Sequence, residues 1–287
     1  MTATTALPPR HAPYVGGDAD EALREARWVI EHAITHQPRS LQERIGPSEI
    51  GNPCDHCLAA KLAGWKQTED GVPWLPFLGT AAHTALEEAF IAHENARNAN
   101  HTGGRRYLVE QKVMVGHIGG EEIWGSCDLF DTAVGMTLDW KIVGPTTLKR
   151  ARSGPSQVYR TQAHLYGRGY ANAGHRVEHV AIAYLPRGSV TLNDAIWWTE
   201  PYNETVAVKA LERANRLHTN LAALAQVGTE VRDAWITNLD RADGCFECHR
   251  YSDKPAGLPR PGRSRVHDDL AGLIPPTGNT ARGTNAA

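Results

Sequence analysis

The sequence lacks any apolar run that approaches the roughly 20 residues needed for a membrane-spanning helix. Its first residues, MTATTALPPRHAP, also lack the apolar core of a secretory signal peptide. We therefore expect no membrane association and no export, and a cytoplasmic location is the default expectation.

The chain has no large excess of charge of either sign. Its 30 lysine and arginine residues and 32 aspartate and glutamate residues give a formal net charge of -2 at pH 7. Proteins that bind nucleic acid through bulk electrostatics are usually strongly basic, so the net charge argues against that class. A local basic groove can still exist within a neutral total, so DNA binding remains open.

Composition and length indicate an ordinary globular protein, with 41% hydrophobic and 22% charged residues in 287. One large domain is the simplest arrangement for this length. We expect a single domain at 19–251, a disordered N-terminus at 1–18 and a flexible C-terminal tail at 252–287. Both terminal segments lack apolar periodicity and are rich in residues that disfavour a packed core.

The order of predicted elements indicates an α/β fold in which a mixed central β-sheet is flanked by helices. The stretch 142–157 is expected to be a polar, basic connection. Helices are predicted before residue 38 and at 79–90, 155–170 and 204–227, and strands at 107–115, within 125–141, at 178–185 and at 194–200. Alternation along 107–115 places Val109, Val113 and Val115 on the face opposite Glu110 and Lys112.

The stretch 125–141, GSCDLFDTAVGMTLDWK, has acidic residues at positions that a buried sheet does not favour. We interpret it as two neighbouring strands joined by a turn at Gly135. Because side chains alternate along a strand, Asp139 and Lys141 share one face, and strand pairing would bring Asp128 beside Asp139. Two carboxylates beside one lysine predict a divalent cation site, since a cation would offset their repulsion. A surface ion pair between Asp139 and Lys141 is the alternative.

Four of the five cysteines form two C-x-x-C pairs, one near each end of the predicted domain. Two such pairs beside Gly or Pro turns predict a four-thiolate metal site that joins the N- and C-terminal parts. Sulfur ligands select zinc or an iron–sulfur cluster over magnesium or calcium. Separate redox motifs and buried thiols are the alternatives, and Cys127 is expected in the core. The predicted ligands are Cys54, Cys57, Cys245 and Cys248.

Further polar residues follow in the order that one catalytic face would need. The motifs G-S-x-D, D-W-K and Q-A-H-L-Y, in this order, resemble the PD-(D/E)XK nuclease superfamily, and specifically its RecB-like branch with a Q-x-x-x-Y motif and an upstream histidine. The flanking cysteines are similar to those of its iron–sulfur members, which include AddB-type nucleases and CRISPR-associated adaptation exonucleases. Those relatives usually have one cysteine before the core and three after it, so zinc stays an alternative to a 4Fe-4S cluster. The residues in question are His83, Glu110, Asp128, Asp139, Lys141, Gln162 and Tyr166.

The resemblance implies a restriction-endonuclease-like core and a divalent-metal-dependent DNA exonuclease, acting in recombination, repair or DNA-end processing. It implies that His83, Asp128 and Asp139 hold one or two Mg²⁺ or Mn²⁺ ions. Lys141 would position the attacking water or offset developing charge, and its pKa should fall beside the metal. Glu110 would orient Lys141 or sit behind the metal ligands.

The resemblance also implies that Gln162 and Tyr166 bond to DNA or brace the metal-bearing strand. The substrate is expected to be single-stranded DNA or DNA with free ends, for which Trp65, Trp74 and Tyr159 are candidate stacking residues. A non-catalytic DNA-binding module on the same scaffold and a redox sensor are the competing functions. Basic residues expected to contact phosphates, unless they form a solvated face, are Lys149, Arg150, Arg152 and Arg160.

Overall fold

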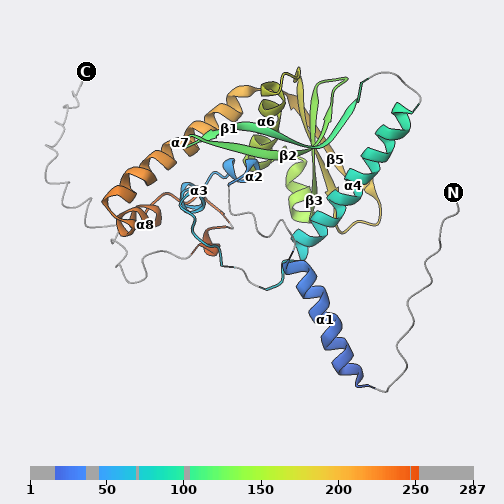
Figure 1. Cartoon of the computed structure of the whole chain (residues 1–287), viewed down its shortest axis with the longest axis horizontal. Helices are drawn as coiled ribbons and strands as arrows, with labels where there is room; N and C mark the ends of the chain where they lie inside the picture. The colour runs from blue at the N-terminus through green and yellow to red at the C-terminus, as the bar shows by residue number, and fades with distance from the viewer. Residues whose placement is uncertain (1–16, 37–44, 69–70, 100–103, 246, 252–287) are drawn as a thin grey trace, which may run out of the picture.

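The computed structural model of the chain describes residues 17–36, 45–68, 71–99, 104–245 and 247–251. They form one five-stranded sheet with helices on both sides (Figure 1), in the order β1-β2-β3-β4-β5. Only β3 and β4 are parallel among the neighbouring pairs. The predicted α/β fold with a mixed, helix-flanked sheet is therefore confirmed. The termini predicted to be disordered, 1–18 and 252–287, lie outside the described residues except for residues 17 and 18.

The elements follow the predicted alternation of helices and strands. Within the described residues, no helix combines the length and the apolar character needed to cross a membrane. The elements are α1 (Ala19–Thr35), α2 (Pro47–Ile50), α3 (Asp55–Leu62), α4 (Trp74–Asn98), β1 (Tyr107–Ile118), β2 (Glu121–Asp131), β3 (Met136–Val143), α5 (Pro145–Ala151), α6 (Gln157–Asn172), β4 (His179–Pro186), β5 (Ile196–Pro201), α7 (Glu204–Val227) and α8 (Thr229–Thr237).

Polar caps explain where the main helices begin. Asp18, Ser156 and Asn203 precede α1, α6 and α7, and each side chain accepts a hydrogen bond from a backbone N–H group in the first turn. Such a cap satisfies a donor that the helix itself leaves free. The observed bounds of α7 are those predicted.

Two segments differ from the sequence prediction. Helix α4 begins at Trp74 rather than Gly79, because Pro76 lies in its first turn, where the missing N–H group of proline costs nothing. The stretch 142–157, predicted to be a connection, contains α5, which Pro145 begins in the same way. In both segments a proline in the first turn marks a helix start that the sequence prediction missed.

The face alternation of β1 changes at Glu110, whose φ of 48° lies in the left-handed region. Val113 and Val115 pack in the core cluster with α6, whereas Val109 packs in the cluster on the α4 side. The predicted placement of these three valines on one face is wrong, because the unusual backbone at Glu110 turns the strand. This conformation costs a non-glycine residue on the order of 1 kcal/mol.

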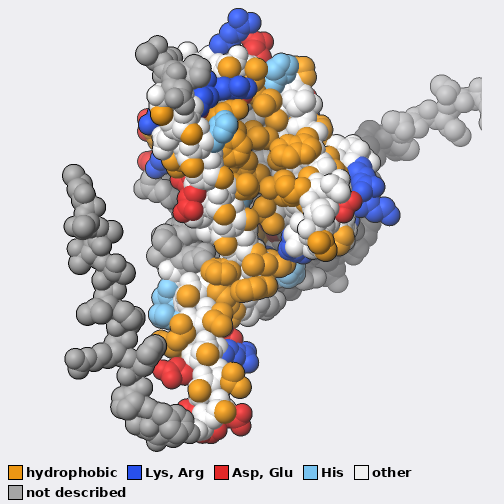
Figure 2. Space-filling view, turned by 90° about the vertical axis from the view of Figure 1, so that its right-hand side faces the viewer, with side chains coloured by type: hydrophobic (Ala, Val, Ile, Leu, Met, Phe, Trp, Pro, Cys, Tyr) orange, Lys and Arg blue, Asp and Glu red, His pale blue; other side chains and the backbone are white. Residues whose placement is uncertain are grey.

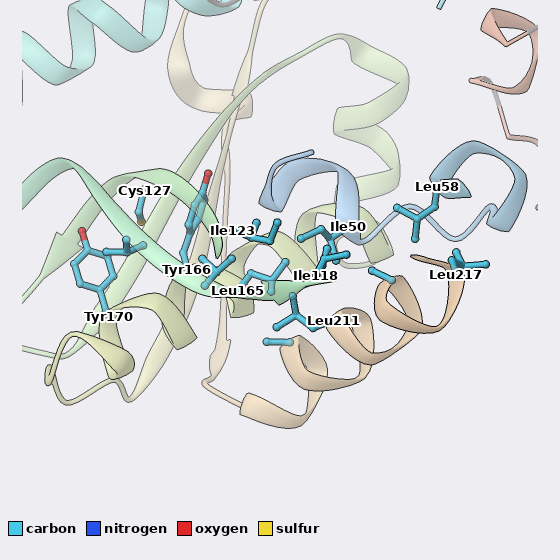
Figure 3. Close-up of a cluster of buried hydrophobic side chains, with 14 of the residues drawn as sticks. Ile50, Leu58, Ile118, Ile123, Cys127, Leu165, Tyr166, Tyr170, Leu211 and Leu217 are labelled. Atoms are coloured by element: carbon cyan, nitrogen blue, oxygen red, sulfur yellow. The ribbon is translucent and has the colours of Figure 1, made fainter. Parts of the chain in front are cut away.

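The main core lies between α6, α7 and the β1–β2 hairpin. Figure 3 shows Leu165 and Tyr170 of α6 near Cys127 of β2, and Leu211 of α7 near Ile118 of β1. Cys127 is fully buried, as predicted. Because α6 belongs to the crossover between parallel strands β3 and β4, it packs against the sheet and presents its polar residues to β3.

The turn of the β1–β2 hairpin is fastened to α7. Gly119 and Gly120 have φ values of 62° and 87°, a conformation that favours glycine. The Asn215 side chain accepts a hydrogen bond from Gly119 N at 2.9 Å and donates one to His117 O at 2.8 Å. The hairpin, which Figure 1 shows reaching α7, is therefore fixed at its far end.

We predict that Asn215→Ala lowers the free energy of unfolding by about 1 kcal/mol, because two hydrogen bonds to the hairpin are lost. Amide hydrogen exchange at 117–120 should become faster than in the wild type. Glu212→Ala, an exposed change on the same helix, is the control and should leave both measurements unchanged. Wild-type exchange at 117–120 in Asn215→Ala would contradict the role of Asn215.

Candidate functional site

The candidate site lies where β2 and β3 separate. Their ladder ends with the pair Leu129 and Leu138; beyond it β2 continues with β1, while β3 continues with β4. We call this point the strand fork. Asp128 and Asp139 occupy the next positions on the two strands, and both are buried and line the same cleft. The structure thus brings together the two aspartates that the sequence pattern singles out.

Asp128 connects β2, β3 and α4 at the strand fork. Its Oδ2 accepts a hydrogen bond from Trp140 N at 2.8 Å, and its Oδ1 lies 3.2 Å from His83 Nδ1. The carboxylate therefore takes the place of a backbone acceptor where the ladder has stopped. The Trp140 ring stacks on Phe90 of α4, with centroids 5.4 Å apart, which holds α4 where His83 reaches the cleft.

A hydrogen-bonded network from α6 positions Asp139 and Lys141. Lys141 Nζ lies 2.6 Å from Asp139 Oδ2 and donates to Gln162 Oε1 at 2.9 Å. Gln162 Nε2 donates to Asp139 Oδ1 at 3.3 Å and to the Tyr166 hydroxyl at 3.1 Å. Of the two roles considered for Gln162 and Tyr166, the contacts match the bracing of the strand that bears Asp139.

Burial raises the pKa of Asp139 to about 6; Lys141 opposes this shift, and the charge of Asp128 adds to it. Burial alone would lower the pKa of Lys141, but the charge and hydrogen bond of Asp139 hold that pKa above its usual value. Lys141 is therefore a cation at neutral pH. The expected fall of its pKa beside a metal concerns the loaded site and stays a prediction.

The donor set at the strand fork fits a hard divalent cation. An imidazole nitrogen of His83 and one carboxylate oxygen each of Glu110 and Asp128 all lie within 4.8 Å of one another. Carboxylate oxygens suit Mg²⁺ and Mn²⁺, and imidazole is an accepted ligand of transition metals. The strained backbone of Glu110 occurs at the residue opposite Asp128 in the β1–β2 register. Glu110 thus joins the candidate ligands. Asp139, which the resemblance implies as a ligand, is outside this group and lines the same cleft beside Lys141, so its contact with the cation stays a prediction.

The site opens into a cleft of about 990 Å³, at the upper end of the range for small-molecule pockets. Its lining comes from the β1–β2 hairpin, which we call one wall, from α2 and α3, which we call the other wall, and from His218 of α7. Besides the residues at the strand fork, the lining includes Pro47, Ser48, Lys61, Leu62, Lys112, Glu121, Glu122, Trp124 and Ser126.

The basic residues predicted to contact phosphates are not among those that line this cleft. Lys149, Arg150 and Arg152 are exposed at the end of α5. Arg160 pairs with Glu200 of β5, with Nε and Oε1 2.5 Å apart. Their contact with DNA stays a prediction, and the ion pair of Arg160 would have to open for it.

Two of the three residues suggested for base stacking remain accessible. Trp65 is buried beside the cysteines and donates a hydrogen bond from Nε1 to Asp233 at 3.1 Å, so that suggestion is wrong. Trp74 is half exposed on α4, and the ring of Tyr159 lies 5.1 Å from Lys141 Nζ.

The two C-x-x-C pairs meet in space. The Sγ atom of Cys248 lies 3.4 Å from that of Cys54 and 3.5 Å from that of Cys57, and Cys57 lies 3.7 Å from Cys245. All four are free thiols. A tetrahedral zinc ion with Zn–S bonds of about 2.3 Å separates its sulfurs by about 3.8 Å, close to these three separations. Ligand atoms of Cys54, Cys57, Cys248 and His56 lie within 4.8 Å of one another, so His56 is a further candidate ligand, whereas Cys245 is outside that group. A 4Fe-4S cluster places each of its four thiolates on a different iron and needs larger separations.

The cysteine cluster also positions one wall of the cleft. Arg213 of α7 donates to Asn52 O at 2.6 Å and to Asp55 Oδ1 at 2.7 Å, next to Cys54. The Asn52 side chain donates to Glu247 Oε2 at 2.7 Å, beside the second cysteine pair. Because Lys61 of α3 lines the cleft, the contacts that fix the start of α3 also fix that wall.

Divalent cation binding should weaken as the pH falls through 6, because protons then compete for the Asp139 carboxylate. We expect the affinity for Mn²⁺ to be about tenfold lower at pH 5 than at pH 7.5, as one protonation at a pKa of about 6 requires. Calorimetric titration of chelator-treated protein measures this change. Asp139→Asn should bind more weakly and lose the pH step, whereas equal wild-type affinities at both pH values would contradict the assignment.

No protein-family model and no curated protein matches the chain. Among solved structures, it is similar to an alkaline exonuclease from Laribacter hongkongensis, with 11% identity, a TM-score of 0.42 and coverage of 66% of this chain and 93% of that chain. The same exonuclease in complex with dAMP has 12% identity and a TM-score of 0.38, and the match covers 64% of this chain and 91% of that chain. A phage-related exonuclease from Haemophilus somnus 129PT has 12% identity and a TM-score of 0.32, and the match covers 67% of this chain and 92% of that chain. At these levels of similarity, we argue function from the geometry of the site.

Proposed function

We propose that the chain is a divalent-metal-dependent DNA exonuclease that hydrolyses phosphodiester bonds. The observation that carries the proposal is the convergence of His83 and Asp128 with the Asp139–Lys141 pair inside one cleft. A carboxylate oxygen of Glu110 lies within 4.8 Å of the ligand atoms of His83 and Asp128. Imidazole and carboxylate groups supply a site for Mg²⁺ or Mn²⁺, and the lysine supplies positive charge where a phosphate would bind.

When bound at the strand fork, the cation would polarise the scissile phosphate and acidify an attacking water. Lys141 would hold that water or offset the charge that develops on the phosphate. Because the charge of Asp139 keeps the pKa of Lys141 high, an electrostatic role fits better than the acceptance of a proton. Gln162, which bonds to both Lys141 and Asp139, keeps the amine directed at the reacting group, and Tyr166 orients Gln162.

The substrate class comes from the cleft and from the sequence motifs together. The cleft is large enough for several nucleotides and carries Lys61 and Lys112 away from the strand fork. The resemblance of the motifs to RecB-like nucleases adds free DNA ends as the point of attack, with recombination, repair or end processing as the setting. A non-catalytic DNA-binding module would have no need for the carboxylates and lysine that are present here.

The cysteine cluster is proposed as a structural metal site. Its sulfur spacing favours zinc over the 4Fe-4S cluster that the resemblance implies. Its binding energy would contribute to folding, because it joins segments that are 194 residues apart. The site would thereby stabilise the α3 wall of the cleft.

We predict that Asp128→Ala and Asp139→Ala cleave end-labelled DNA at least about 10³-fold more slowly than the wild type, because the cation loses its ligands. Gln162→Ala should be slowed by about 10- to 100-fold, because it only positions Asp139 and Lys141. The assay uses chelator-treated protein with Mg²⁺ or Mn²⁺ restored.

Asp194→Ala, which removes an exposed carboxylate outside the cleft, is the control and should cleave at the wild-type rate. Wild-type cleavage by Asp139→Ala, or no cleavage by the wild type with either ion, would overturn the proposed function.

Metal analysis tests the cysteine cluster. We expect colourless protein with one zinc per chain after anaerobic purification. Cys57→Ser and Cys248→Ser should lose the metal and unfold at a lower temperature, whereas Cys127→Ser should retain the metal, because Cys127 lies in a different cluster. Brown protein that absorbs near about 400 nm would show an iron–sulfur cluster instead.

A further inference from the structure

An aromatic side chain lies on the same wall of the cleft as the candidate metal ligands. Trp124, Ser126 and Asp128 occupy alternate positions of β2, and all three line the cleft. At a rise of about 3.4 Å per residue, Trp124 and Asp128 are about 14 Å apart along the strand. Stacked nucleotides of one strand repeat at about 3.4 Å, so this distance corresponds to a few nucleotides.

The ring of Trp124 has a defined orientation. Its Nε1 donates a hydrogen bond to Glu122 Oε2 at 2.9 Å, and Lys112 Nζ lies over the ring, 5.9 Å from its centroid. The side chain remains 43% exposed. Single exposed apolar residues are common on protein surfaces. Trp124 differs from them because its ring is oriented, partly open and located inside the cleft that contains the carboxylates.

The wall that carries Trp124 is fixed at its far end. Asn215 of α7 bonds to the hairpin turn on both sides, through Gly119 N and His117 O. Gly116 lies so close to α7 that an added Cβ would come within 2.5 Å of Leu211. A binding surface on such a wall is preorganised, because the hairpin does not have to be ordered when a ligand arrives.

The charges of the cleft favour a single strand over a duplex. Lys112 lies beside the ring, and Lys61 on the opposite wall is paired with Glu49 at 3.0 Å. Glu121 and Glu122 bring negative charge to the same part of the cleft. Duplex binding depends on neutralising many phosphates, whereas a single strand can bind by stacking its bases on an aromatic ring.

We propose that Trp124 is a stacking platform for a base of single-stranded DNA and that Lys112 contacts the phosphate next to that base. This inference rests on the proposed nuclease function and names its substrate as a single strand that enters along the β1–β2 hairpin. Trp124 binds substrate a few nucleotides from the strand fork and takes no part in bond breaking. Its contribution belongs to affinity and to KM.

The test measures binding of a fluorescein-labelled oligothymidylate and of a blunt duplex of equal length, by anisotropy in chelator-containing buffer that prevents cleavage. Trp124→Ala should weaken binding of the single strand by about 5- to 100-fold, the range expected for one base–aromatic stack. Trp124→Phe should stay within about threefold of the wild type, because phenylalanine keeps a ring for stacking. Duplex binding should change by less than about twofold in both variants.

Cleavage kinetics with Mn²⁺ and thermal unfolding complete the test. Trp124→Ala should raise KM for single-stranded DNA and leave both kcat and the unfolding temperature near wild type. The matched control is Trp197→Ala, which removes a 67% exposed tryptophan of β5 outside the cleft. It should leave affinity, KM and kcat unchanged.

The two proposals fail in different ways. If the wild type cleaves DNA but Trp124→Ala keeps wild-type affinity and KM, the stacking platform is wrong and the nuclease proposal stands. If both DNA forms lose affinity equally in Trp124→Ala, the preference for a single strand is overturned. If the wild type cleaves nothing, yet Trp124→Ala loses affinity for single-stranded DNA and keeps affinity for the duplex, the stacking platform stands and the nuclease proposal fails.

Discussion

The hydrogen bond from Trp140 N to Asp128 Oδ2 determines the geometry on which the site depends. It joins β2 to β3 at the residue where their ladder ends, so the strands can separate without leaving that donor unsatisfied. The opening places Asp128 and Asp139 across from each other, with His83 within reach. Burying carboxylates is costly unless partners compensate. The imidazole and Lys141 compensate in part, but burial still raises the pKa of Asp139, and the charge of Asp128 adds to that shift. A divalent cation beside the two carboxylates would offset both the cost of burial and their mutual repulsion.

Helix α7 makes the cleft a fixed structure. Through Asn215 it holds the turn of the β1–β2 hairpin, and through Arg213 it holds the segment that begins α3. The cysteine cluster joins that second segment to the end of the described chain. Both walls therefore depend on one long helix, while α6 supplies the residues that brace Asp139. Helix α6 thus positions the side chains at the strand fork, and α7 positions the two walls of the cleft that leads to it.

The sequence predicted the sheet and the partners at the strand fork, because strand alternation, glycine turns and helix caps are local signals. It also predicted that the cysteine pairs meet, since thiol spacing of this kind has few other uses. It placed Val109 on the wrong face, because the left-handed backbone of Glu110 leaves no signature in an apolar pattern. The sequence suggests Trp65 for stacking and does not single out the exposed Trp124, because tertiary packing decides which indole is buried.

Anomalous X-ray diffraction from crystals equilibrated with Mn²⁺ is the most direct measurement of the central claim. The account predicts an anomalous peak at the strand fork, within bonding distance of Asp128 and Asp139 and adjacent to His83 and Glu110. A saturating concentration of Mn²⁺ that supports DNA cleavage but leaves the strand fork without a peak would contradict the account.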